Sequence, residues 1–288
     1  MRAQIRFLPG GRLHLQDGPI DLIVQAYGSG EKVEAAYAAA SRRFVSVLDE
    51  LCGELALLRK RATPESPNPR GCIAQRMMDA VRPFARENFI TPMAAVAGAV
   101  AENILCSMTQ ASELSRAYVN NGGDIAIHLE EGEQFIVGMI DRPDRPSLFG
   151  TATLTSNQPA RGIATSGWRG RSFSLGISDS VTVLAERAAN ADAAATIIAN
   201  AVDLPGHSAI VRVPARELAP DSDLGDIKVT HDVGYLSGAE VAEALESGQR
   251  VAESLSERGL IHSAALLLRG ETRIVTAQER FAEKLVHA

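Results

Sequence analysis

The stretch GIATSGWRGRSFSLGISDSVTVLAERAANADAAATIIANAVD, residues 162–203, joins three local patterns. A loop rich in Gly, Ser and Arg comes first, a run of β-branched and apolar residues follows, and an Ala-rich helical pattern ends the stretch. Asp192 and Thr196 lie four residues apart in that helix, so their oxygen atoms share one face. An anion-binding loop beside two oxygen ligands for a hard cation predicts a site for a phosphate-bearing ligand.

The loop has the composition of an anion site. It offers hydroxyl groups, accessible backbone N–H groups and two guanidinium groups, which suit a phosphate or another oxyanion. The candidate ligand-binding residues in it are Thr165, Ser166, Gly167, Arg169 and Arg171. The simpler alternative is a solvated hairpin loop. Ser166 is a weak candidate for a nucleophile, because it lies outside a G-x-S-x-G pattern and has no neighbouring histidine in sequence.

The helix that follows carries an isolated carboxylate. Asp192 lies among alanines, and a carboxylate on an apolar face needs a partner. A metal ion, an arginine or a helix N-terminus could be that partner. For a metal ion, Mg²⁺ is favoured over Zn²⁺, because the nearby donors are oxygens.

A second polar cluster, NNGGD, lies at residues 120–124 between two apolar strand patterns. Its candidate ligand-binding residues are Asn121, Gly122, Gly123 and Asp124. The two glycines can adopt positive φ without strain, so the backbone can approach a ligand closely. The alternative is a hairpin turn whose Asn side chains cap its own backbone.

An acidic segment near residue 220 leaves three interpretations open. Asp221, Asp223 and Asp226 precede His231, which would suit a second cation site or a general base in hydrolysis, but solvated loop charge is the commoner outcome. The sequence contains no H-E-x-x-H, Walker-type or G-x-G-x-x-G motif.

Composition narrows the classes of protein. The 288-residue chain has a net charge of −6 and 5% aromatic residues, which argues against a nucleic-acid partner. Three widely spaced cysteines give neither a disulfide framework nor a zinc pattern, and we expect reduced thiols in a cytoplasmic protein. No apolar run approaches the roughly 20 residues that cross a bilayer, and no signal-peptide pattern begins the chain.

The order of helical and strand patterns predicts an α+β fold, with helices packed on largely antiparallel sheets. Glu31 to Lys60 is expected to form one helix, a helix capped by Thr91 opens at Pro92, and a further helix spans 185–201. A short terminal helix is expected over 277–287. We expect a single domain over residues 1–288, with two subdomains that divide near 141–160.

These residues resemble the ApbE-like superfamily, whose founding members are Mg²⁺-dependent FAD:protein FMN transferases. The similarity is greatest to a separate branch, distantly related to those transferases. The segments that carry it are TPMAAVAGAVAE, VNNGGDIA, GIATSGWRGRSFSLG, DSVTVLA and ADAAATIIANAVDLPGH. The resemblance covers about residues 10–270 and implies a compact α+β body with a pseudo-duplicated layout.

The resemblance also implies roles for individual residues. Asp192 and Thr196 match the side chains that hold Mg²⁺ in the transferases, and a backbone carbonyl near Ala97 or Gly98 would complete that site. Gly122, Gly123, Thr165, Ser166 and Gly167 match the segments that line the flavin pocket. FAD or FMN and Mg²⁺ are therefore the implied cofactors, with an acceptor protein as a further partner.

The chain departs from the transferases in two places. It lacks their His-x-Ile-x-Asp-Pro-x-Thr-Gly segment after the TSG loop, and Ala97-Gly98-Ala99 stands where they carry a Lys-Gly pair. These departures bear on the transfer reaction more than on the pocket. Two hypotheses follow: a flavin-binding protein related to the transferases, or a protein of different chemistry that binds a non-flavin anionic metabolite.

Overall fold

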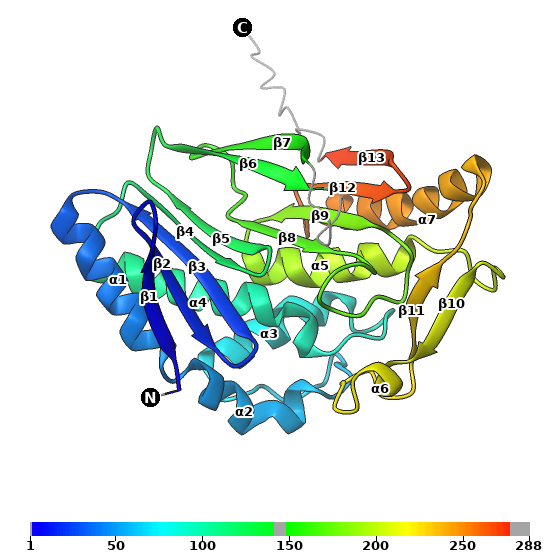
Figure 1. Cartoon of the computed structure of the whole chain (residues 1–288), viewed down its shortest axis with the longest axis horizontal. Coiled ribbons are helices and arrows are strands. Elements are labelled where there is room, and N and C mark those ends of the chain that lie inside the picture. Colours follow the sequence, from blue (N-terminus) through cyan, green and yellow to red (C-terminus); the bar gives the residue numbers. More distant parts are fainter. Residues whose placement is uncertain (1, 141–147, 277–288) are drawn as a thin grey trace, which may run out of the picture.

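The computed structural model describes residues 2–140 and 148–276. Within them, nine strands form one antiparallel sheet in the order β1-β2-β3-β4-β5-β8-β9-β12-β13 (Figure 1). Its strands are β1 (Gln4–Leu8), β2 (Arg12–Asp17), β3 (Ile20–Tyr27), β4 (Arg116–Asn121), β5 (Asp124–Leu129), β8 (Gly162–Ser166), β9 (Ser180–Ala185), β12 (Ser263–Leu268) and β13 (Glu271–Thr276). Two separate hairpins are β6 (Gln134–Ile140) with β7 (Leu148–Thr155), and β10 (Ile210–Pro214) with β11 (Lys228–Val233).

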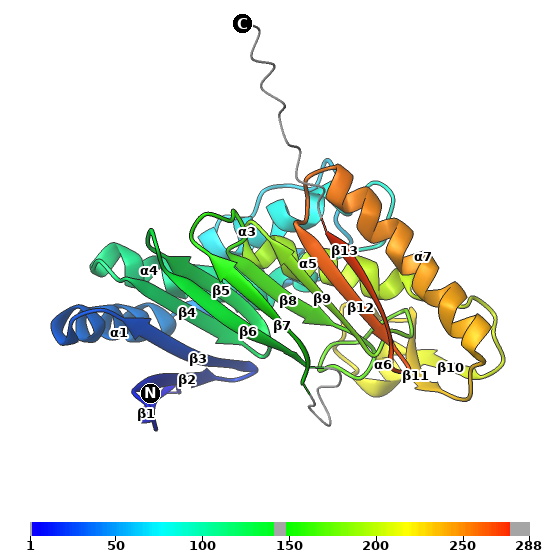
Figure 2. The same cartoon turned by 90° about the horizontal axis from the view of Figure 1, so that it is seen from above.

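The helices gather on one face of this sheet (Figure 2). They are α1 (Gly30–Phe44), α2 (Val47–Leu58), α3 (Cys72–Val81), α4 (Val96–Ala111), α5 (Ala188–Ala201), α6 (Ala215–Leu218) and α7 (Gly238–Glu257), with 3₁₀ turns η1 (Arg82–Phe84) and η2 (Pro92–Ala95). Helix α4 packs on β4 and β5, α5 packs on β8 and β9, and α7 packs on β12 and β13. The predicted α+β class with antiparallel sheet and packed helices is confirmed.

Successive side chains along each strand point to opposite faces of the sheet. Ala126 and Ala164 face the helices and belong to the main core, while their neighbours Ile127 and Ile163 face the other way. Those two isoleucines form a second, smaller core with Leu154 of the β6–β7 hairpin. The central sheet is therefore covered on both faces, by helices on one and by this hairpin on the other.

The first turn of α5 lies against glycines from two other elements. A Cβ atom on Gly98 of α4 would lie 2.3 Å from the Ala188 carbonyl oxygen, and one on Gly162 of β8 would lie 2.2 Å from the Ala188 nitrogen. Glu102, one turn after Gly98, accepts a hydrogen bond from the Ala189 N–H at 2.8 Å. Because glycine permits this approach of one backbone to another, α5 is fixed between α4 and the sheet.

Three expectations about the helices were wrong in detail. The pattern over 31–60 forms two helices: α1 ends at Phe44 and α2 begins at Val47, and the hydroxyl of Ser46 between them donates to the Glu50 carboxylate at 2.6 Å. Thr91 does not cap a helix with its side chain, and Pro92 opens a 3₁₀ turn instead of α4. Helix α5 begins at Ala188, because β9 continues to Ala185.

The predicted terminal helix at 277–287 lies outside the described residues, as does the segment 141–147. The predictions of one domain over residues 1–288 and of a division near 141–160 therefore remain predictions. Within the described residues, none of the helices combines the length and the apolar character that spanning a membrane requires.

We predict that Gly98→Ala destabilises the protein by about 1–3 kcal/mol, because the added methyl group must displace backbone of α5. The matched control is Gly53→Ala in α2, where a Cβ atom meets nothing within 4 Å. That change should stabilise the protein by about 0.5–1 kcal/mol, since alanine favours a helix. Urea denaturation measures both, and a Gly98→Ala protein as stable as the Gly53→Ala protein would contradict this packing.

Candidate functional site

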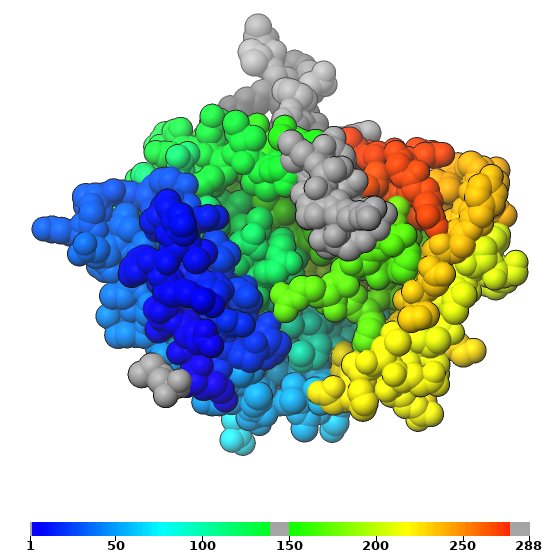
Figure 3. Space-filling view, in the orientation of Figure 1, coloured from blue at the N-terminus to red at the C-terminus, as the bar shows by residue number. Residues whose placement is uncertain are grey.

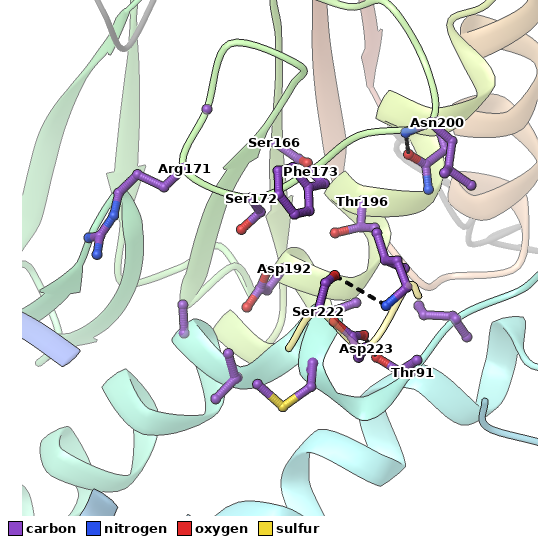
Figure 4. A pocket seen from close by; sticks show the side chains of 18 of the residues that line it. Thr91, Ser166, Arg171, Ser172, Phe173, Asp192, Thr196, Asn200, Ser222 and Asp223 are labelled. Atoms are coloured by element: carbon purple, nitrogen blue, oxygen red, sulfur yellow. Dashed lines mark hydrogen bonds between the residues drawn. The ribbon is translucent and has the colours of Figure 1, made fainter. Parts of the chain in front are cut away.

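A pocket of about 390 Å³ opens between α4, α5, the segment 165–175 and the loop before β11 (Figure 4). It brings together most of the residues selected from sequence. Those that line it are Ala97, Gly122, Asp124, Thr165, Ser166, Gly167, Arg171, Asp192 and Thr196. The NNGGD turn, the TSG loop and the Ala-rich helix thus contribute to one cavity, although they are separated in sequence.

One face of α5 supplies three polar side chains to this pocket. Asp192, Thr196 and Asn200 lie at successive intervals of four residues, and all three line the cavity. The Asn200 Oδ1 accepts a hydrogen bond from the Leu175 N–H at 2.8 Å, which ties the segment 172–175 to the helix. Sequence analysis missed Asn200, although the same spacing that marked Thr196 could have found it.

The backbone of α4 fixes the Asp192 carboxylate. The Gly98 N–H donates to Asp192 Oδ2 at 3.0 Å, and this bond crosses the close α4–α5 contact. The neighbouring Ala97 carbonyl accepts a hydrogen bond from the Asn121 side-chain amide at 3.1 Å. Asn121 therefore lies behind the pocket wall, where it holds the carbonyl selected from sequence as a cation ligand.

Two carboxylates share the pocket without a basic partner. Asp124 accepts a hydrogen bond from the Thr165 N–H at 3.1 Å, and within the described residues it forms no ion pair. Burial raises the pKa of Asp124 to about 7. Burial, together with the charge of Asp124, raises the pKa of Asp192 well above its ordinary value. A positive charge placed between these two carboxylates would favour the ionised form of both.

The donor atoms fit a hard cation. Asp192 offers a carboxylate, Ala97 a backbone carbonyl, and Thr196 a hydroxyl that bonds none of the described residues. All three are oxygen donors, as Mg²⁺ prefers. Within the described ranges, no group of three or more His, Cys, Asp or Glu side chains is placed to hold a metal ion. A cation here would therefore complete its coordination with oxygen atoms from water or from a bound ligand.

The glycine turn and the TSG loop shape the opposite wall. Gly122 adopts φ +66°, and a Cβ atom there would lie 3.0 Å from a guanidinium nitrogen of Arg171. Gly167 lies so close to the Asp179 carbonyl oxygen that a Cβ atom would approach it to 2.6 Å. Figure 4 shows Arg171 extending away from Asp192 and Thr196, so the positive side chain lies at one end of the cavity.

Three selected residues are not brought into the pocket wall. Gly123 donates its N–H to the Asn120 side chain at 2.8 Å, so the turn is partly capped by its own asparagine. Asn121 is buried behind the wall. Arg169 donates to the Asp179 carboxylate at 3.1 Å and covers the Trp168 ring at 4.1 Å from its centroid. Of the two loop arginines, Arg171 alone lines the cavity.

Sequence analysis also missed residues that reach the pocket by tertiary contact. Ser222 lines it beside Asp221 and Asp223, the two aspartates that the sequence had offered as a second cation site, a general base or solvated loop charge, without a link to this pocket. His231 lies on β11 and is not among the lining residues. Apolar lining comes from Phe89, Ile90, Met93, Ala94, Val96, Phe173, Leu175 and Leu224. No sequence spacing identified these contacts, because each depends on how distant elements pack.

The raised pKa of Asp124 gives a pH dependence with a definite sign. Between about pH 4 and 7 the folded protein binds this proton more tightly than the unfolded chain, so stability falls as pH rises through that range. In metal-free buffer with EDTA, Asp124→Asn should remove this loss. The stability of the variant relative to the wild type should therefore increase from pH 5 to pH 8, as measured by urea denaturation.

The control for this measurement is Asp79→Asn, which changes an exposed carboxylate on α3. Its difference from the wild type should vary little with pH over the same range. A pH-independent difference for Asp124→Asn would contradict the raised pKa of the Asp124 carboxyl group.

Comparison with solved structures finds distant similarity to proteins named ApbE. The chain is 15% identical to the ApbE protein of Thermotoga maritima, with 88% of this chain and 77% of that chain covered and a TM-score of 0.39. It is 13% identical to the flavin transferase ApbE from Vibrio cholerae, with 96% and 98% covered and a TM-score of 0.37.

Curated relatives are more similar in sequence over a shorter span. A UPF0280 protein of Methanopyrus kandleri is 40% identical over 128 residues, which cover 44% of this chain and 48% of the relative. A UPF0280 protein of Methanothermobacter thermautotrophicus is 38% identical over 138 residues, with 47% and 50% covered. The chain thus spans about half the length of the curated relatives it matches.

The family comparison covers almost the whole chain and agrees with the resemblance noted in the sequence. The model described as "AbpE bacteria" matches residues 5–274, and the chain therefore belongs to this ApbE-related family.

Proposed function

We propose that this protein binds a flavin nucleotide, or a related phosphate-bearing ligand, in the pocket between α4, α5 and the TSG loop, together with Mg²⁺. The observation that carries the proposal is the pairing of Asp124 and Asp192 without a basic partner, beside the unbonded hydroxyl of Thr196. A divalent cation would neutralise the negative charge of this pair and would also attract a phosphate group.

The charge of the lining supports a cation-dependent mode of binding. Four aspartates and two arginines line the cavity, and Arg59 forms an ion pair with Asp221 at 3.1 Å. Arg171 then supplies the one lining guanidinium without an ion pair in the described chain. A phosphate group alone would meet mostly negative charge, so it needs a bound cation as well as Arg171.

Each side chain has a separate part in the proposal. Asp192, Thr196 and the Ala97 carbonyl would hold Mg²⁺, which would supply positive charge to the phosphate oxygens. Asn121 would keep the Ala97 carbonyl in place through its amide, and the Gly98 N–H would orient Asp192. Arg171 would contact the ligand anion from the side of the Gly122 turn.

The remaining lining suits an aromatic ring system. Met93, Phe173, Leu175 and Leu224 give the cavity an apolar part away from Arg171. Its volume of about 390 Å³ lies near the lower end of the range for small-molecule sites, about 300–1,000 Å³. This volume favours a mononucleotide over a dinucleotide as the fully enclosed ligand.

We place the protein in the cytoplasm, where its free cysteines would stay reduced.

The proposal predicts reciprocal coupling between Mg²⁺ and FMN. Because the chain offers only part of a coordination shell, each ligand should bind weakly alone, and Mg²⁺ should strengthen FMN binding by about 5–150-fold. Calorimetric titration of FMN and of FAD, each with and without Mg²⁺, measures this coupling. Asp192→Ala should abolish the effect of Mg²⁺ while leaving the weak metal-independent binding in place.

Two controls accompany this titration. Asp79→Asn, an exposed carboxylate outside the pocket, should retain full coupling. Thr196→Val should reduce the coupling, whereas Thr109→Val in α4 should not. Full coupling in Asp192→Ala would refute the metal assignment, and no binding of FMN or FAD at millimolar concentration would refute the flavin assignment.

A non-flavin anionic metabolite is the second candidate, and the absence of the His-containing segment supports it. In its place the chain runs through Ser172 and Phe173, which line the pocket. Mg²⁺-dependent binding of a simple phosphate ester in the same titration, without binding of either flavin, would favour this candidate. Transfer to an acceptor protein is tested separately, by incubation with FAD and a flavin-accepting protein.

A further inference from the structure

We infer that residues 215–227, here called the flap, form a hinged wall of the pocket that moves as a unit and is held closed by two side-chain contacts. The flap comprises α6 and the loop before β11, and five of its residues line the cavity: Ala219, Asp221, Ser222, Asp223 and Leu224. The inference concerns access to the pocket and holds for any ligand.

The backbone of the flap is bonded to itself. The Ala215 N–H donates to the Ile227 carbonyl and the Arg216 N–H to the Gly225 carbonyl, both at 2.9 Å, which closes the segment at its base. Further turns are closed by bonds from the N–H groups of Ala219, Ser222, Gly225 and Ile227 to carbonyls within the flap. Within the described chain, no backbone hydrogen bond joins residues 215–227 to another element. The flap can therefore move without breaking its own backbone bonds.

Two side-chain contacts hold the flap against the body of the protein. The Thr91 hydroxyl, at the start of η2, donates to the Asp223 carboxylate. Arg59, at the end of α2, donates to the Asp221 carboxylate at 3.1 Å. Asp221 is largely exposed, with 81% of its side-chain surface accessible, so that ion pair is weak. In the space-filling view the yellow residues of this region adjoin light-blue residues, the colour of the part of the chain that holds α2 (Figure 3).

The base of the flap is anchored at a different place. Thr230 of β11 donates its N–H to the Ser174 carbonyl at 2.8 Å, and Arg212 of β10 pairs with Asp203. The β10–β11 hairpin forms its own two-stranded sheet, separate from the nine-stranded one. Anchorage at the hairpin and only two side-chain hydrogen bonds at the tip place the hinge near Pro214 and Lys228, where β10 ends and β11 begins.

This arrangement links pocket closure to Thr91, which directly precedes η2 and α4. Met93 and Ala97 follow Thr91 in the chain and line the same cavity. Closure of the flap therefore completes the wall opposite α5, and its release opens that wall to solvent. Opening should depend on the two contacts at the tip and not on the ion pair inside the flap, where Arg216 bonds Asp226 at 2.8 Å.

Pulsed electron–electron resonance on the ligand-free protein tests the inference. One spin label is attached to Cys52, an exposed residue of α2, and the other to Pro220→Cys at the tip of the flap, with Cys72→Ser and Cys106→Ser as background. Thr91→Val removes the hydroxyl donor, and Asp221→Asn removes the charge of the ion pair with Arg59, both with little change in shape. In the double variant, a longer label–label distance should gain population, by about two- to tenfold for each contact removed.

Asp226→Asn is the matched control, because it breaks an ion pair within the flap, and it should keep the wild-type distances. Amide hydrogen exchange provides a second measurement: Ala219, Ser222 and Ile227 should stay protected in the double variant, since a rigid flap keeps its internal bonds. Unchanged distances in the double variant would overturn the inference. Longer distances accompanied by loss of amide protection would also overturn it, because the segment would then unfold and not pivot.

Discussion

The close contact between the first turn of α5 and two glycines is the constraint on which the pocket depends. Gly98 and Gly162 allow the backbone at Ala188 to lie where any side chain would collide. With α5 fixed there, Asp192 lies one turn further along and receives the Gly98 N–H. Glu102 strengthens the same contact, because it accepts the Ala189 N–H and pairs with Arg76 at 2.9 Å. The packing of α5 and the position of the Asp192 carboxylate therefore depend on the same contact.

The pocket also contains an unfavourable electrostatic interaction between two carboxylates. Asp124 and Asp192 are brought together without a basic side chain, and burial raises the pKa of both. Folding alone gains nothing from such a pair, since each ionised carboxylate disfavours the other. Groups that weaken folding are commonly kept for binding or catalysis. A cation bound between the two carboxylates would remove their repulsion and would attract an anionic ligand.

Sequence patterns predicted the α+β class with antiparallel sheets, because alternation of apolar and polar residues indicates strands with one buried face. They also selected Asp192 and Thr196, since a spacing of four is a local property of a helix. The same spacing would have added Asn200.

The break after Phe44 was missed because neither Gly nor Pro marks it. Arg169 and Arg171 could not be separated by sequence, because the path of the loop turns one toward Asp179 and the other toward the pocket. The contact of Thr91 with Asp223 joins residues far apart in the chain, so no local pattern reports it.

The central claim is that a divalent cation binds at Asp192, Thr196 and the Ala97 carbonyl. Anomalous X-ray scattering from crystals grown with Mn²⁺ and FMN tests it most directly, since Mn²⁺ takes oxygen ligands as Mg²⁺ does. We predict an anomalous peak at bonding distance from the Asp192 carboxylate and the Thr196 hydroxyl, with a ligand phosphate on its open side. A peak at Asp221 and Asp223 with none at Asp192, or no peak in the pocket, would contradict the account.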